Sequence, residues 1–247
     1  MRDLDFLTRL PVAHRGLHDA TRGVVENTPT AIMAAIEGGY GIEIDVQLSG
    51  DGEAMVFHDF TLDRLTTGSG PLRARAANAL KEVAFRATAD RMMTLPEVLA
   101  LVNGRAPLLI ELKSAFDGDT RLARRCVELI SAYRGPAALM SFDPEMLVAV
   151  RCANSRIVRG IVAERHYEDG EWALLPPHTR CVLSHLLHWP RTRFQFLAYR
   201  AADLVSTQPR VARALGLPVL AWTVRTHEDR TLASAYADQM IFEGFCP

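Results

Sequence analysis

The sequence lacks the features that mark several large classes of protein. No run of about eighteen apolar residues occurs, so we expect no segment that spans a membrane. Positive and negative charges nearly balance, with 28 Lys and Arg against 29 Asp and Glu, which excludes a globally basic chain that binds nucleic acid. Residues 1–11 lack the apolar core of a secretory signal, which favours a cytoplasmic location.

Cysteine is also scarce. The chain has four cysteines, and the closest two, Cys126 and Cys152, are too far apart in the sequence for a zinc knuckle or a redox pair. Cys126, Cys152 and Cys181 stand in apolar stretches, whereas Cys246 does not. We therefore expect buried free thiols of the kind found in a reducing compartment.

The composition that remains is that of an ordinary globular protein. The 247 residues are 49% hydrophobic and 23% charged, and a single α/β barrel often has this length. No low-complexity linker divides the chain. We expect one domain over residues 1–247.

A short apolar strand, a turn and an amphipathic helix recur along the chain. Strands are expected at residues 10–14, 42–48, 108–113, 138–142, 157–162, 203–206, 219–224 and 240–243. Helices are expected at residues 29–37, 94–102, 119–133, 144–153, 209–215 and 228–236, with caps at Thr28, Thr94 and Asp119. This repeat predicts a parallel (β/α)₈ barrel, or TIM barrel. Residues 163–202 fit it poorly, and residues 181–184 are predicted as a strand or a loop segment.

One connection departs from the repeat. The segment Ser49-Gly50-Asp51-Gly52-Glu53 is typical of a hairpin turn, and no crossover helix fits there. Residues 54–58 should therefore run antiparallel to the strand at 42–48. Their return places His58 beside the C-terminal end of that strand, where barrel enzymes have their active sites.

Acidic side chains alternate with apolar ones in two of the expected strands. In Ile42-Glu43-Ile44-Asp45-Val46 the two carboxylates share the face that points into the barrel, and Glu111 and Lys113 do the same in the next strand. Three inward carboxylates suit Mg²⁺ or Ca²⁺ rather than zinc or copper. The alternative is a set of interior ion pairs, for example between Glu111 and Arg15.

Two histidines end strands in matching positions. His14 ends the first strand, and His58 ends the return strand of the hairpin. A histidine pair at a barrel mouth can supply a proton acceptor and a proton donor, and a nearby arginine and lysine can hold a phosphate. The remaining histidines are expected on the surface or in loops: His18, His166, His178, His185, His188 and His227.

These motifs together resemble one known family. In chain order they are His14-Arg15-Gly16, Glu26-Asn27-Thr28-Pro29, Glu43-Ile44-Asp45-Val46, His58-Asp59, Thr61-Leu62-Asp63-Arg64, Gly68-Ser69-Gly70, Leu95-Pro96-Glu97-Val98-Leu99, Glu111-Leu112-Lys113, Ser141-Phe142-Asp143 and Trp222-Thr223-Val224. The ordered set covers most of the chain and resembles the glycerophosphodiester phosphodiesterases. That family folds as a (β/α)₈ barrel.

The resemblance implies a metal-dependent enzyme that cleaves a small-molecule phosphodiester to glycerol 3-phosphate and an alcohol. It implies a divalent cation (Mg²⁺, Ca²⁺ or Mn²⁺) held by Glu43, Asp45 and Glu111. The implied acid–base pair is His14 and His58. The implied substrate contacts are Arg15, Lys113 and Trp222.

Some of these assignments have alternatives. Trp222 either contacts the substrate or is a core aromatic residue. Glu26 and Asn27 either order the first loop or only cap the helix that follows. Which histidine is the acid stays open, as do the nucleophile (water or the glycerol 2-hydroxyl) and the oligomeric state.

Two positions depart from the family pattern. Arg225 stands where the family usually has Asn, and Phe242-Glu243-Gly244 stands where the last strand usually ends in Thr-Asp. Both are expected at the barrel mouth, where Arg225 would favour an anionic head group. The alternative is that Arg225 turns outward and pairs with Glu228 or Asp229.

Two other functions compete with this interpretation. One is a phospholipase-D-like barrel that acts on lysophospholipid or sphingolipid head groups. The other is a non-catalytic phosphodiester-binding relative. Because a binding protein needs no proton-transfer pair, the presence of both histidines and all three carboxylates favours an enzyme.

Overall fold

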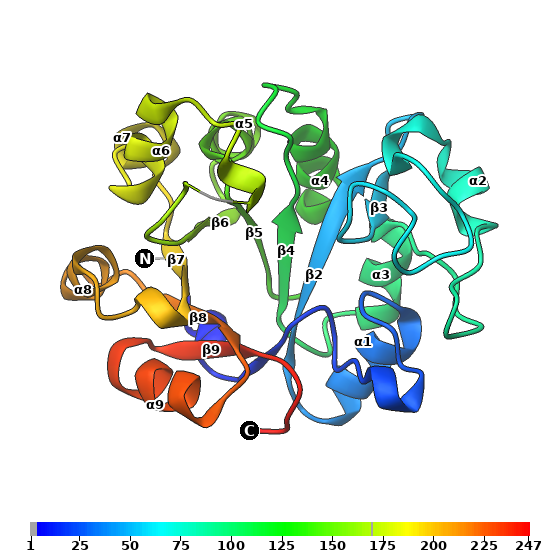
Figure 1. Ribbon diagram of the computed structural model, residues 1–247, viewed down its shortest axis with the longest axis horizontal. Coiled ribbons are helices and arrows are strands. Elements are labelled where there is room, and N and C mark those ends of the chain that lie inside the picture. Colours follow the sequence, from blue (N-terminus) through cyan, green and yellow to red (C-terminus); the bar gives the residue numbers. More distant parts are fainter. Residues whose placement is uncertain (1–3, 169) are drawn as a thin grey trace.

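The computed structural model describes residues 4–168 and 170–247 and consists of a closed ring of parallel strands surrounded by helices (Figure 1). The barrel strands in the described residues are β1 (Val12–Ala13), β2 (Gly41–Leu48), β4 (Leu108–Leu112), β5 (Ala137–Ser141), β6 (Val158–Ala163), β7 (Phe196–Arg200), β8 (Val219–Val224) and β9 (Gln239–Phe242). Neighbours pair in parallel, and β1 pairs with both β2 and β9, which closes the ring. The predicted TIM barrel is confirmed.

Helices form the outer layer. They are α1 (Pro29–Glu37), α2 (Ala77–Lys81), α3 (Leu95–Val102), α4 (Arg121–Ala132), α5 (Pro144–Ala153), α6 (Pro177–Ser184), α7 (Trp189–Thr192), α8 (Thr207–Ala214) and α9 (His227–Tyr236). Thr28 caps α1 ahead of Pro29, and Thr94 caps α3 in a capping box with Glu97, as predicted. Asp119 lies one residue before the cap position of α4, although its carboxylate accepts the Arg121 N–H at 3.1 Å. No helix in the described ranges is long and apolar enough to cross a membrane.

The predicted hairpin after the second strand is present. Strand β3 (Ala54–Val56) pairs antiparallel with the upper half of β2. The Gln47 amide, which points inward from β2, donates to the carbonyls of Phe57 and His58 at 3.0 and 2.9 Å. These bonds hold the returning chain, and with it His58, against the end of β2.

Strand alternation separates the apolar cluster outside the barrel wall from the cluster inside it. Ile42, Ile44 and Val46 of β2 pack outward against the helices. Leu109 and Phe196 belong to a separate cluster inside the barrel, which Leu7 from the short 3₁₀ turn Asp5–Leu7 also joins. Because these residues lie near the N-terminal ends of their strands, the lower interior is filled, and the polar inward positions lie toward the C-terminal ends.

Two strand predictions were wrong. Residues 181–184 lie in helix α6, and residues 203–206 form a 3₁₀ turn (Ala201–Asp203) and a bend. The sixth barrel strand is Phe196–Arg200, a short apolar run with no polar alternation. A strand buried on both faces carries no period-two signal, so such a run cannot be distinguished from other buried segments by periodicity.

The expectation of buried thiols holds for one cysteine. Cys126 lies on the buried face of α4, whereas Cys152, Cys181 and Cys246 are exposed, and all four are free. Cys152 and Cys181 have apolar neighbours in the sequence, but they lie on helices, where consecutive residues point in different directions. Apolar context along the chain therefore did not predict burial.

The interior between β6 and β7 is packed so tightly that one position requires glycine. Gly160 of β6 lies opposite Phe196 of β7, and Phe196 is fully buried. A Cβ atom added to Gly160 would lie 2.3 Å from atoms of the Phe196 ring. The ring occupies the space that any side chain at position 160 would need.

Gly160→Ala is therefore expected to destabilise the protein by about 1–3 kcal/mol, the usual cost of overpacking a core. For a chain of this size that corresponds to a fall in Tm of about 2–4 °C per kcal/mol, measured by calorimetry. Phe196→Leu shortens the opposing side chain, so the double variant should lose less stability than the sum of the two single variants. Additive losses would contradict the predicted clash.

Candidate active site

The inward side chains at the C-terminal ends of the strands line a cavity of about 200 Å³. Its walls include His14 after β1, Glu43 on β2, Glu111 on β4 and Trp222 on β8. The predicted residues Arg15, His58 and Lys113 also line it. Asp45 lies next to them and is 1% exposed. The structure thus brings together every residue that the sequence proposed for catalysis, metal binding or substrate contact.

Three carboxylates meet at this cavity. Glu43, Asp45 and Glu111 each place an oxygen atom within 4.8 Å of the others. Oε1 of Glu43 is buried and has no hydrogen-bond partner among the described residues. Burial, together with the charges of Asp45 and Glu111, raises the pKa of Glu43 well above its ordinary value. An all-oxygen set with an unpartnered buried oxygen fits a hard divalent cation.

Asp45 lies in a different electrostatic environment from Glu43. Burial opposes its ionisation, but the cations of Lys113 and Arg15 hold the pKa of Asp45 well below its ordinary range. Arg15 Nε lies 3.2 Å and Lys113 Nζ 3.8 Å from its oxygens. Asp45 is therefore the firmly ionised member of the cluster.

Asn27 ties the first loop to this carboxylate. Its amide donates to Asp45 Oδ2 at 3.0 Å, and its carbonyl oxygen accepts the backbone N–H of Asp45 at 3.2 Å. Since Thr28 is the cap of α1, Asn27 orders the loop rather than capping the helix. Glu26 also acts in the loop, where its carboxylate pairs with Arg15 at 2.8 Å.

The interior pair between Glu111 and Arg15, given above as an alternative to a metal site, is not formed. Glu111 instead pairs with Lys113, whose ammonium lies 2.9 Å from Oε1. Arg15 bridges Glu26 and Asp45. Both cations are thus anchored at the cavity wall by carboxylates.

Each histidine of the pair is held by a carboxylate. His14 Nδ1 lies 2.7 Å from Glu243 Oε2, and His14 Nε2 lies 4.0 Å from Glu43 Oε2. His58 Nδ1 lies 2.8 Å from Asp59 Oδ1. Burial lowers the pKa of His14, against the opposing effect of the hydrogen bond to Glu243. Burial therefore favours the neutral form of the His14 imidazole.

A chain of alternating charges connects His58 to the carboxylate cluster. Asp59 pairs with Arg64 Nε at 2.6 Å, and Arg64 in turn pairs with Glu26 at 2.7 Å. Glu26 then pairs with Arg15, which contacts Asp45. The first loop and the segment after β3 are therefore locked together across the mouth.

Sequence reasoning gave no catalytic role to Asp59, Arg64 or Glu243. Asp59 and Arg64 belong to the motifs His58-Asp59 and Thr61-Leu62-Asp63-Arg64, and Glu243 belongs to a segment that departs from the family pattern. Burial opposes ionisation of Glu243, but His14 and Arg225 lower its pKa to about 2. Glu243 is thus a fixed anion beside His14.

Trp222 lines the cavity and is also packed as a core aromatic residue. It lines the cavity, while its indole N–H donates to the Ala198 carbonyl at 3.0 Å and its ring meets Phe142 edge-on at 5.3 Å. The packing fixes the ring that faces the cavity.

Arg225 follows neither of its two expected arrangements completely. It lines the rim of the cavity, but its guanidinium pairs with Glu243 at 3.0 Å. Asp229 receives only the backbone N–H of Arg225, at 3.1 Å. The charge of Arg225 is therefore partly compensated at the mouth.

Two of the histidines expected on the surface or in loops are not exposed. His188 is 4% exposed next to α7, and burial lowers its pKa to about 4. His18 is half-buried, and its Nε2 lies 3.9 Å from Glu243 Oε2.

The fold and the cavity define a TIM barrel that gathers acidic, basic and histidine side chains at the C-terminal ends of its strands, where barrel enzymes have their active sites. Over residues 14–243 the chain matches the sequence model of the "Glycerophosphoryl diester phosphodiesterase family". The chain belongs to this family and is a phosphoric diester hydrolase by class.

Individual relatives agree with this assignment. "Glycerophosphodiester phosphodiesterase 1" of Bos taurus is 27% identical, over 96% of this chain and 79% of the relative. "Glycerophosphodiester phosphodiesterase" of Caldanaerobacter subterraneus is 34% identical, over 50% of this chain and 53% of the relative. A phosphodiesterase of Oleispira antarctica, solved in complex with sn-glycerol-3-phosphate, has the same fold, with a TM-score of 0.78 at 24% identity, over 96% of this chain and 94% of that one.

Replacing Glu43 by Gln tests the repulsion among the three carboxylates. Gln keeps the shape and can still accept the Arg15 backbone N–H, which Glu43 accepts at 2.9 Å. A carboxyl whose pKa is raised by folding costs stability at pH values above its ordinary pKa of 4.5. Cation-free Glu43→Gln protein should therefore be about 1 kcal/mol more stable than wild type at neutral pH, or about 2–4 °C higher in Tm.

This difference should shrink as the pH falls toward 4.5, because the Glu43 carboxyl is then protonated in the unfolded as well as in the folded wild-type protein. Added Mg²⁺ should raise the Tm of wild type more than that of the variant. Glu37→Gln, at an exposed position on α1, is the control. Equal stability of the cation-free proteins at neutral pH would show that the protein alone relieves the repulsion.

Proposed function

We propose that this enzyme hydrolyses glycerophosphodiesters to glycerol 3-phosphate and an alcohol, with a divalent cation and with His14 and His58 as the acid–base pair. The observation that carries the proposal is the meeting of an oxygen-only cluster and two carboxylate-held histidines in one cavity. The product bound to the Oleispira antarctica neighbour supports glycerol 3-phosphate as the ligand. The proposed domain is residues 1–247, of which residues 1–3 and 169 lie outside the described part.

Glu43, Asp45 and Glu111 would hold the cation, which we propose to be Mg²⁺, Ca²⁺ or Mn²⁺. Such an ion supplies Lewis-acid charge stabilisation to a phosphate oxygen. Arg15 and Lys113 would contact the same phosphate. Arginine offers five N–H donors and lysine three, so each can bind phosphate while a carboxylate holds it in place.

The two histidines differ in ways that suggest their roles. Nδ1 of His14 faces Glu243, and a neutral imidazole that donates from Nδ1 has a free lone pair on Nε2. His14 would therefore accept the proton of the attacking hydroxyl, either of water or of the glycerol 2-hydroxyl. His58, with Asp59 on its Nδ1, would give a proton to the leaving alkoxide as the P–O bond to the alcohol breaks.

Phosphorus NMR on a small panel of diesters tests the proposed reaction. Purified enzyme with Mg²⁺ should convert glycerophosphocholine to glycerol 3-phosphate, and a transient cyclic phosphate signal would identify attack by the 2-hydroxyl. Lysophosphatidylcholine and sphingomyelin in the same panel test the phospholipase-D-like alternative. A chain that binds these diesters but forms no product would be a binding protein, which would refute the proposal.

His14→Ala and His58→Ala should each lower kcat by about 10²–10⁴, because each removes one proton-transfer step. The wild-type rate should show a bell-shaped pH profile, and each variant should lose one limb of it. Circular dichroism checks the fold, and exposed His185→Ala is the matched control. A His58→Ala enzyme with near-normal kcat would remove His58 from the mechanism.

Arg225→Asn tests whether the rim cation selects the head group. Arg225 is half exposed and compensated by Glu243, so its effect should be small. We expect a fall of up to about fivefold, or about 1 kcal/mol, in the kcat/KM ratio of glycerophosphoserine to glycerophosphocholine. Arg210→Asn on α8 is the control, and an unchanged ratio would show that Arg225 has no part in specificity.

A further inference from the structure

A second group of metal-ligating side chains lies beside the proposed active site. It consists of His14, His18 and Glu243. We propose that these residues form an inhibitory site for Zn²⁺ and similar transition-metal ions, and that its occupation takes His14 out of proton transfer. The inhibitory role rests on the proposed function of His14, whereas the metal site itself does not.

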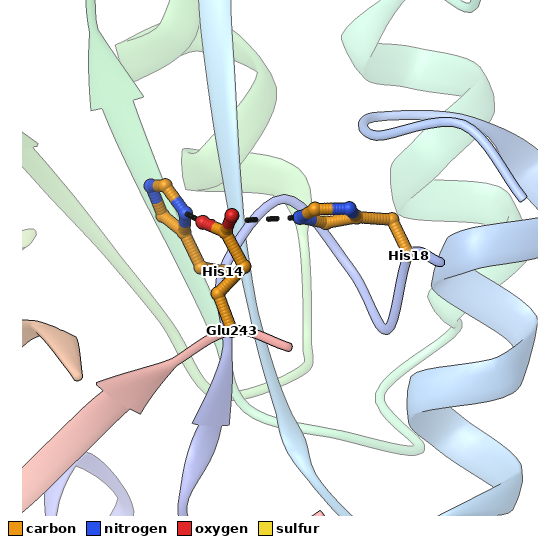
Figure 2. A group of neighbouring side chains, drawn as sticks. All are labelled: His14, His18 and Glu243. Carbon is orange, nitrogen blue, oxygen red and sulfur yellow. Dashed lines mark hydrogen bonds and ion pairs between the residues drawn. The ribbon is translucent and has the colours of Figure 1, made fainter. Parts of the chain in front are cut away.

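The three side chains converge on one point. Figure 2 shows the Glu243 carboxylate between the two imidazole rings. His14 Nδ1 lies 2.7 Å and His18 Nε2 3.9 Å from Glu243 Oε2, and the three ligand atoms lie within 4.8 Å of one another. Zinc binds nitrogen and oxygen ligands at about 2.0–2.2 Å, which places tetrahedral ligand atoms about 3.5 Å apart. Small movements of the side chains would create the site.

His18 has no evident role other than this convergence. Its Nε2 is buried and forms no hydrogen bond with any described residue. A sharp turn brings it there, because Gly16 has a φ of +78° and a Cβ at that position would lie 2.8 Å from the Ala31 backbone. The Leu17 N–H then donates to the Ala31 carbonyl at 2.9 Å, which holds the turn against α1. An unpartnered buried imidazole nitrogen aimed at a carboxylate is a ready metal ligand.

The donor set separates this site from the carboxylate cluster. Two imidazoles and one carboxylate favour Zn²⁺, Cu²⁺ or Ni²⁺, whereas Glu43, Asp45 and Glu111 offer only oxygen and favour Mg²⁺ or Ca²⁺. Saturating Mg²⁺ should therefore fill the oxygen cluster and leave the histidine site to zinc.

Zinc on Nδ1 would reverse the tautomer of His14. In the proposed reaction Nδ1 carries the proton and Nε2 accepts one. A neutral imidazole bound to zinc through Nδ1 carries its proton on Nε2, so the proton moves between the two nitrogens and none is released. Nε2 can then no longer accept a proton from the attacking hydroxyl.

Arg225 should weaken this site. Its guanidinium lies 3.0 Å from the same Glu243 oxygen and would repel a second cation. Arg225→Asn is therefore expected to tighten zinc binding, and His18→Asn to weaken it. The two variants alter zinc affinity in opposite directions at one site.

The test measures zinc binding by calorimetry, and inhibition by zinc in parallel, in saturating Mg²⁺. Wild type should bind one Zn²⁺ and lose activity over the same concentration range. His18→Asn should keep its activity in Mg²⁺ alone, while both its zinc affinity and its sensitivity fall at least tenfold. Exposed His185→Asn is the matched control. Equal sensitivity of wild type and His18→Asn would place the inhibitory zinc elsewhere and overturn the proposal.

Zinc-edge X-ray absorption provides a measurement that does not depend on turnover. It should count two imidazole ligands in wild type and one in His18→Asn, and one or none in wild type would overturn the site. Two imidazoles with undiminished turnover would overturn the inhibitory role alone. Failure to cleave any diester in Mg²⁺ would refute the proposed function and leave the zinc ligands measurable.

Discussion

Three carboxylates inside the barrel repel one another, and the surrounding cations offset that repulsion. Glu43, Asp45 and Glu111 lie where water is largely excluded, and like charges at this distance raise the cost of ionising all of them. Arg15 and Lys113 compensate Asp45, and Lys113 also pairs with Glu111. Glu43 keeps one oxygen without a hydrogen-bond partner among the described residues, and a divalent cation fits this deficit.

The same constraint organises the mouth of the barrel. Arg15 can face Asp45 because Glu26 holds its other end, and Glu26 is in turn held by Arg64. Arg64 also orients Asp59, the carboxylate beside His58. A series of ion pairs thus connects the buried carboxylate cluster to His58 on the returning hairpin. Glu243, which follows the last strand, holds His14, which follows the first strand. The contact between these two strands therefore positions one histidine of the proposed acid–base pair.

A tightly packed apolar layer lies below these charged residues in the barrel interior. Apolar side chains fill the lower barrel interior, and at Gly160 the Phe196 ring takes the space of a side chain. Such packing leaves the inward positions at the C-terminal ends of the strands as the place for polar groups. The division between an apolar floor and a charged mouth follows from strand alternation repeated around a closed ring.

Features that depend on short stretches of sequence could be predicted from the sequence alone. Strand alternation placed Glu43, Asp45 and Glu111 inward, the hairpin turn returned His58 to the mouth, and the caps of α1 and α3 marked helix starts, because each signal acts over a few residues. The pairing of His14 with Glu243 could not be predicted in this way, because the two residues are 229 positions apart in the sequence. The same holds for the position of β7, the exposure of Cys152 and Cys181, and the convergence of His18 on the last strand. These features depend on which elements become neighbours when the barrel closes, so only the tertiary structure decided them.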